Sequence, residues 1–158
     1  MVKEQLINNE IGDALNNFDV NSYDNYGNNI LHYYLKNSEN INIENAIFLK
    51  ALVGKGLDIN ALQSKSPKCS ALHLSVKLKK RNILEVLVDA GAKIDITDEN
   101  GNTPLWESVM GYKNDDPFYI KFLITKGADK NIQNNYAVSP LSLSNIIANY
   151  DSRYLLNQ

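Results

Sequence analysis

The chain has 158 residues, of which 44% are hydrophobic and 22% charged, a composition typical of a soluble globular protein. Its formal net charge of -2 and its isoelectric point near 5.7 argue against general electrostatic attraction to nucleic acid or to an anionic membrane. A single cysteine, Cys69, excludes an internal disulfide and fits a reducing compartment, and no segment approaches the roughly 20 apolar residues that a membrane-spanning helix needs.

Residues 1–21 are the first segment along the chain. Glu4 and Asn8 stand where a signal peptide would have an apolar run, so we expect a cytoplasmic protein. Residues 18–27, which overlap this segment, look like the end of an earlier, degenerate unit of the repeat described next. Residues 1–21 are therefore predicted to form an N-terminal capping half-repeat.

Four similar units follow, with predicted boundaries at residues 22–60, 61–95, 96–131 and 132–158. A leucine just after each expected helix start recurs at intervals of 41, 33 and 36 residues: Leu31, Leu72, Leu105 and Leu141. A glycine that closes the first three units recurs at intervals of 35 and 36 residues: Gly56, Gly91 and Gly127. Two independent markers that agree indicate an internal repeat.

Each unit is predicted to begin with a turn and a short helix. Thr103 suits the N-cap of such a helix because its hydroxyl can accept an orphan backbone N–H, and Pro104 suits the first helical position because it has no N–H to lose. The equivalent caps in the other units are Asn29, Ser70 and Ser139. Gly27 and Gly101 come two residues before their caps, where a tight turn favours positive φ.

Each unit then continues with a longer apolar helix. Apolar runs at residues 46–53, 83–88 and 118–124 have the density of helices buried on one side. The extra residues of the longer units are expected in loops between paired helices, at Lys36–Asn45 and Gly111–Tyr119, with Pro117 at a helix start. The predicted core consists of Leu31, Leu35, Leu49, Leu52, Leu72, Val86, Leu87, Leu105, Phe122, Leu123 and Leu141.

These features resemble the ankyrin repeat, whose period is about 33 residues. Its motif is visible as Asp98, Gly101 and Thr103-Pro104-Leu105, as Leu31-His32, as Leu72-His73, and as Gly127-Ala128-Asp129 with Asn131. The resemblance implies an all-α ankyrin-repeat solenoid of stacked helix pairs with short β-hairpin-like turns, one domain over residues 1–158, and a C-terminal capping repeat at residues 132–158. Trp106, Ala137 and Lys65 depart from the motif, which leaves the local hairpin geometry open.

The sequence offers little support for catalysis. His32 and His73 occupy the same repeat position, so a structural role in the stack explains both, and Cys69 lies in a variable turn position without a fixed histidine partner. Asp98 and Glu107 match part of an EF-hand loop, but Ile96 stands at its first position. We expect no catalytic, cofactor or metal site, and therefore a protein that is not an enzyme.

Binding of another protein is the function that the resemblance implies, through exposed turn tips and the inner helix face. The candidate contact residues are Tyr23, Asn25, Tyr26, Asn28, Lys68, Glu99, Asn100, Asn102, Trp106, Tyr112, Asn135 and Tyr136. Further candidates on the inner helices are Lys36, Asn37, Lys77 and Met110. We expect a chain that is monomeric when free and whose partner is neither nucleic acid nor a membrane.

Two narrower functions and a second surface remain open at this stage. The chain suits an immunity protein that masks the active site of a toxin enzyme, or an effector that acts on host proteins. A basic run of Lys77, Lys79, Lys80 and Arg81 is either solvated charge at a turn between helices or a contact for an acidic partner surface.

Overall fold

The computed structural model describes residues 16, 18–37, 44–114, 116–147 and 151–156. Within these residues the helices form four successive pairs. The pairs are α2 (Ile30–Asn37) with α3 (Asn45–Gly54), α4 (Ala71–Lys77) with α5 (Arg81–Asp89), α6 (Pro104–Met110) with α7 (Phe118–Thr125), and α8 (Pro140–Ile146) with α9 (Arg153–Leu156). The described residues contain no strand beyond an isolated antiparallel bridge between Leu62 and Ser70, so the predicted all-α solenoid is confirmed.

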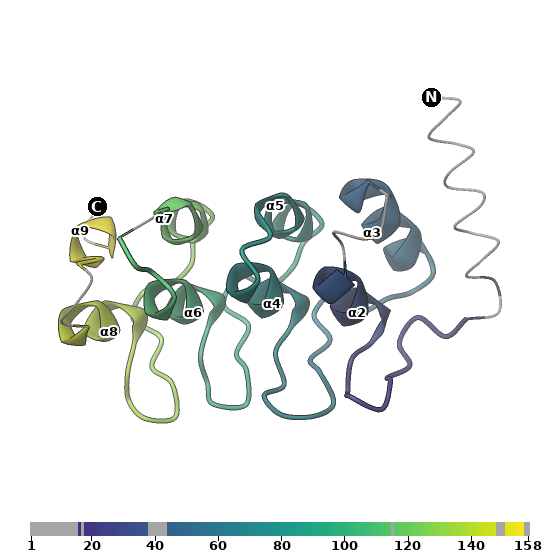
Figure 1. Cartoon of the computed structure of the whole chain (residues 1–158), viewed down its shortest axis with the longest axis horizontal. Helices are drawn as coiled ribbons and strands as arrows, with labels where there is room; N and C mark the ends of the chain where they lie inside the picture. Colours follow the sequence, from purple (N-terminus) through teal and green to yellow (C-terminus); the bar gives the residue numbers. More distant parts are fainter. Residues whose placement is uncertain (1–15, 17, 38–43, 115, 148–150, 157–158) are drawn as a thin grey trace.

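Figure 1 shows the pairs stacked side by side in two rows. The inner helices α2, α4, α6 and α8 form one row and the outer helices α3, α5, α7 and α9 the other. Each inner helix contacts the next one, and the turns that connect successive pairs extend from the inner row as a series of hairpins. This arrangement lets each helix pair cover the apolar side of its neighbour.

The core runs between the two rows of helices. Leu35, Leu52, Leu72, Leu105 and Leu123 are among its fully buried side chains, as predicted. Three predicted core residues are only partly buried, each for a local reason. Val86 lines an open groove between α3 and α5, Phe122 stacks on Phe118 at the surface, and Leu141 lies on the last inner helix.

The predicted caps begin the inner helices. Thr103 Oγ1 accepts the Trp106 N–H at 3.2 Å, and Asn29 Oδ1 accepts the His32 N–H at 3.1 Å. Ser70 and Ser139 also cap their helices, and there the side chain at the third helical position bonds back to the cap N–H. In α6 that position holds Trp106, which has no acceptor, so Thr103 caps the helix alone.

One position keeps a positive φ in all four hairpins, with different residues. Gly27 and Gly101 have φ values of 82° and 76°, and Lys68 and Ala137 occupy the same place with φ values of 53° and 59°. A Cβ on Gly101 would lie 2.8 Å from Asn135 Oδ1 in the next hairpin. No described hairpin follows Ala137, which explains why a methyl group is tolerated there.

Lys65 changes the second hairpin, where Asp24, Asp98 and Asn134 hold the same place in the others. Those three residues accept backbone N–H groups of their own turns, which a lysine cannot do. Lys65 instead donates to the carbonyl of Asn25 in the first hairpin, at 2.7 Å. The departure from the motif therefore alters one turn and leaves the stack intact.

A second set of bonds ties the repeats together where the outer helices end. Asn21 Oδ1 accepts the Asp58 N–H at 3.0 Å, and Asn60 Oδ1 accepts the Lys93 N–H at 2.8 Å. Asp95 takes the same role for the Asp129 N–H at 3.1 Å. The side chain at this one position of the repeat thus accepts a backbone N–H group of the next unit.

Some sequence predictions fall partly or wholly outside the described residues. The loop expected at Lys36–Asn45 includes residues 38–43, and the N-terminal capping half-repeat at 1–21 includes residues 1–15 and 17, all outside the description. The loop expected within Gly111–Tyr119 is present between α6 and α7. The repeat boundaries stay a prediction.

Among the described residues, no helix has the length and apolar character needed to cross a membrane.

Replacing the cap of α6 tests the local basis of these helices. Thr103→Ala removes the acceptor of the Trp106 N–H, and it should lower the free energy of unfolding by about 1 kcal/mol. Thr103→Ser keeps the hydroxyl and serves as the control. Urea denaturation followed by circular dichroism measures both, and an unchanged midpoint for Thr103→Ala would show that the cap contributes nothing.

The hairpin stacking predicts unequal effects at equivalent turn positions. Gly101→Ala should destabilise the chain by more than about 1 kcal/mol, because the new Cβ meets Asn135 and the backbone keeps a positive φ. Ala137→Gly should change stability little, since relief of the positive φ is offset by greater freedom of the unfolded chain. Equal thermal midpoints for Gly101→Ala and the unmodified chain would contradict the stacking argument.

Candidate functional site

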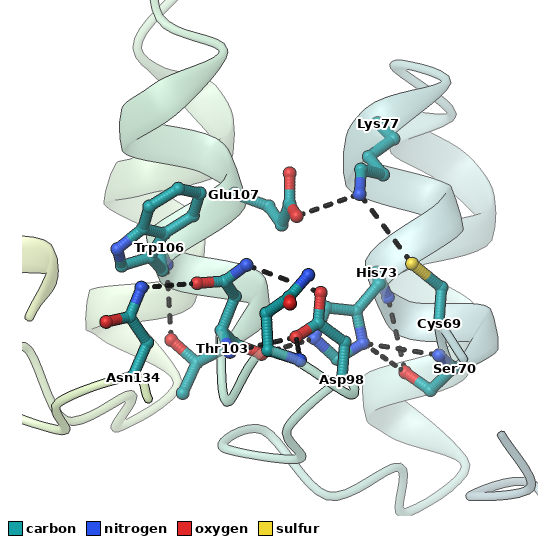
Figure 2. A network of polar contacts seen from close by, with 11 residues as sticks. Cys69, Ser70, His73, Lys77, Asp98, Thr103, Trp106, Glu107 and Asn134 are labelled. Carbon is teal, nitrogen blue, oxygen red and sulfur yellow. Dashed lines mark hydrogen bonds and ion pairs between the residues drawn. The ribbon is translucent and has the colours of Figure 1, made fainter. Parts of the chain in front are cut away.

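The two histidines are buried near the starts of their inner helices. His73 Nε2 lies 2.9 Å from the Asn102 carbonyl, which can only accept, so Nε2 carries the proton and Nδ1 accepts the Ser70 N–H. Figure 2 shows this ring connecting α4 to the turn before α6. Burial lowers the pKa of His32 and of His73 to about 4, so both rings are neutral near pH 7. The predicted structural role agrees with the geometry of His73, which links two repeats, whereas His32 Nδ1 accepts the Asn29 N–H at the start of its own helix.

Cys69 lies beside the same network and is fully buried. Burial raises the pKa of its thiol, which outweighs the opposite effect of Lys77, whose Nζ lies 3.7 Å from the sulfur. The thiol is therefore protonated near neutral pH and is a poor nucleophile. Among the residues that the structure describes, no group of three or more His, Cys, Asp and Glu side chains could hold a metal ion.

The basic run after α4 is engaged within the chain. Lys77 Nζ lies 2.8 Å from Glu107 Oε1, and Arg81 Nη2 lies 2.5 Å from Asp116 Oδ2. The Arg81 guanidinium also lies over the ring of Phe118, 4.0 Å from its centre. These contacts join the second repeat to the third. They favour a role in the stack over a contact for an acidic partner.

The turn tips present the most exposed aromatic side chains of the predicted set. Tyr26 is 80% exposed and Tyr136 is 73% exposed. Their backbones are nevertheless fixed, because the Tyr26 N–H donates to Asp24 Oδ1 at 2.8 Å and the Tyr136 N–H donates to Asn134 Oδ1 at 2.9 Å. Each ring therefore projects from an ordered turn, which limits the backbone entropy lost when the ring is buried by a partner.

Bonds between hairpins align the tips along one edge. The Ser64 N–H donates to the Gly27 carbonyl at 2.9 Å, and the Asn135 N–H donates to the Asn100 carbonyl at 2.9 Å. Asn135 Nδ2 also donates to the Glu99 carbonyl at 3.0 Å. Figure 1 shows the four hairpins side by side below the inner helices.

We define the tip surface as the predicted contact residues whose side chains are exposed in this structure. They are Tyr23, Asn25, Tyr26, Lys68, Glu99, Asn135 and Tyr136. Asn100 and Trp106 are only partly buried and are left out of this definition.

Asn28, Asn102 and Tyr112 are buried, so the expectation that they are exposed is wrong. Asn28 Oδ1 accepts Gln63 Nε2 at 2.7 Å, and Asn102 Oδ1 accepts Asn134 Nδ2 at 2.8 Å. Both amides are used to join adjacent hairpins. Tyr112 packs in the core, where its hydroxyl lies 3.2 Å from that of Tyr154. The tip surface excludes these three residues.

Sequence reasoning missed two exposed apolar side chains on the inner helices. Tyr33 on α2 is 56% exposed and Ile146 on α8 is 66% exposed. Met110, which was a candidate, is 55% exposed on α6. Aligning the repeats could have found Ile146, which is equivalent to Met110. It could not have found Tyr33, because the equivalent residues Leu74 and Leu143 are buried.

Comparison with known proteins gives a consistent match. A family model for ankyrin repeats (3 copies) matches residues 41–134. Ankyrin repeat protein OPG189 of variola virus is 29% identical over 78% of this chain and 22% of its own length. The putative ankyrin repeat protein FPV031 of fowlpox virus is 33% identical over 68% of this chain and 32% of its own length. The ankyrin repeat and KH domain-containing protein mask-1 of Caenorhabditis elegans is 38% identical over 39% of this chain and 2% of its own length.

The buried histidines predict a loss of stability in acid. Their pKa is about 4 in the folded chain against an ordinary value of 6.5, so the unfolded chain binds protons first as the pH falls. The free energy of unfolding should therefore decrease from about pH 6.5 down to about pH 4. Urea denaturation at several pH values measures this. His73→Gln should show a shallower decrease above about pH 5, and an equally steep one would contradict the assignment.

Proposed function

Because this chain belongs to the ankyrin-repeat family, whose members generally bind other proteins and are generally not catalysts, we propose that it acts by stoichiometric binding of another protein. The proposed contact is the tip surface together with the exposed side of the inner helices. Since the chain spans 22% and 32% of the two viral relatives, the proposal concerns this repeat domain alone.

The exposed tyrosines on ordered turns are the observation that carries the proposal. Tyr26 and Tyr136 lie on the first and last of the four hairpins and bring large, rigid contact area with a polar end. Met110 and Ile146 add exposed apolar area on the inner helices. A few aromatic anchors among polar neighbours are typical of residues that dominate protein interfaces.

The chemistry of the described residues also favours binding over turnover. Both histidines are buried and neutral, the one cysteine is buried and protonated, and Glu107 is paired with Lys77. The narrower hypotheses, an inhibitor of a toxin enzyme and an effector acting on host proteins, stay predictions, as does the monomeric state of the free chain.

Paired substitutions at the tips test the proposal. A partner is first captured from the source cells on the immobilised chain, purified, and measured by titration calorimetry. Tyr26→Ala with Tyr136→Ala should weaken its binding at least about tenfold, because truncating buried interface tyrosines commonly costs about 2 kcal/mol or more. Circular dichroism and the melting midpoint should stay unchanged, since both rings are exposed.

Matched changes on the outer helices provide the control. Lys50→Ala on α3 and Lys121→Ala on α7 alter exposed residues away from the tips and should leave the affinity unchanged. Binding that survives the tyrosine pair would show that another face is used. Turnover of a substrate by the chain alone would overturn the non-catalytic proposal.

A further inference from the structure

A groove of about 360 Å³ lies beside the first repeat, between the segment that precedes α2 and α2 itself. Phe18, Tyr23 and Asp24 line it from the preceding segment, and Ile30 and Tyr33 line it from α2. In Figure 1 this segment is the purple trace that leads into the first hairpin, at the N-terminal end of the stack. The volume is within the range of small-ligand sites, roughly 300–1,000 Å³.

Three aromatic side chains around the groove are unusually accessible. Phe18 is 47% exposed, Tyr23 is 44% exposed and Tyr33 is 56% exposed. The face of an aromatic ring carries partial negative charge, so rings that surround a groove attract cations as well as apolar groups. Three such rings favour a ligand that carries positive charge on an apolar stem.

Asp24 adds a full negative charge to the same groove. The backbone bond from Asn28 is the main cause that keeps the pKa of this carboxyl below its ordinary value, so it is ionised near neutral pH. Its Oδ1 accepts the N–H groups of Tyr26 and Asn28 at 2.8 Å each, whereas Oδ2 accepts only Asn28 Nδ2, at 3.2 Å, among the described residues. Oδ2 therefore retains capacity to accept a further donor.

The turn itself does not require this charge. Asn134 holds the equivalent place in the fourth hairpin and accepts the same pair of backbone N–H groups through its amide oxygen. Lys36, the cation that acts on Asp24, donates to Asn28 Oδ1 at 2.8 Å and is not among the residues that line the groove. The carboxylate thus stands as a charge available to a ligand.

We propose that this groove binds a cationic side chain of the partner protein, an alkylammonium group of the lysine type, with its stem between the three rings and its charge at Asp24. The biological meaning of the site rests on the proposed function, because the cation comes from the bound protein. Binding of the isolated cation does not, so the site can be tested without a partner.

Peptide titration of the isotope-labelled full chain, followed by NMR, tests the site directly. The probes are short acetylated alanine peptides that carry one lysine, one trimethyllysine or one norleucine, the last being a neutral side chain of similar length. Saturable shifts of backbone amides within residues 18–33 are expected with the cationic peptides and not with norleucine. Saturation by either cationic peptide supports the proposal, and the tighter of the two identifies the source of the cation.

Substitutions distinguish the contribution of the Asp24 charge to peptide binding from that of the Tyr33 ring. Asp24→Asn should weaken binding of the cationic peptide by about two- to fivefold while the turn stays formed, as it does with Asn134. Tyr33→Leu should weaken it by about two- to fivefold because the ring face is lost, whereas Tyr33→Phe should not. Tyr136→Leu, at the far end of the stack, is the control and should leave the affinity unchanged.

Equal binding of the norleucine peptide would overturn the proposal, because the groove would then be merely apolar. An absence of shifts in the full chain would also overturn it. Loss of partner binding in the tip variants, with the peptide titration unchanged, would separate the two surfaces. Failure of the peptide titration alone would leave the tip-surface proposal standing.

Discussion

Each helix pair in this chain has apolar side chains on both flanks, and only a neighbouring pair can cover them. The stability of the fold therefore depends on the contacts between neighbouring repeats, which we call seams. The polar groups at these seams follow the same rule. His73 bonds to the Asn102 carbonyl of the next hairpin, Asn60 bonds to the Lys93 N–H of the next unit, and Asn28 accepts the Gln63 amide. Polar groups that find partners across a seam, the buried His73 and Asn28 above all, fix the register that apolar contact alone leaves loose.

This constraint also explains where function can reside. Side chains that bond to a neighbouring repeat are committed to the stack, which accounts for His73, Lys77 and Arg81. At the hairpin tips the two exposed tyrosines are tied through their backbone N–H groups, so their rings can vary without loss of the fold. Tyr26 and Tyr136 occupy such positions. A surface fixed in its backbone and free in its side chains is well suited to partner recognition.

The features that were predictable from sequence are those set by local backbone chemistry. Thr103 before Pro104 predicts a helix start wherever it occurs, and Gly101 predicts a positive φ, because both depend on a few consecutive residues. Burial of Asn28 and Asn102 was not predictable, since an asparagine in a turn has the same local signature whether its amide meets water or the next hairpin. The pairing of Arg81 with Asp116 likewise depends on the register of two repeats. The groove at Tyr33 required knowing which element lies beside α2.

The ion pairs that join repeats are concentrated at one place. Among the described residues, Lys77–Glu107, Arg81–Asp116 and Lys126–Asp89 all cross the middle seam, between the second and third repeats. Added salt screens exposed ion pairs and leaves buried apolar contact largely unaffected, so ionic strength weakens the middle seam more than its neighbours. Tyr26 and Tyr136 lie on opposite sides of that seam. Ionic strength is therefore expected to act first on the contact between the two halves of the stack that carry these tyrosines.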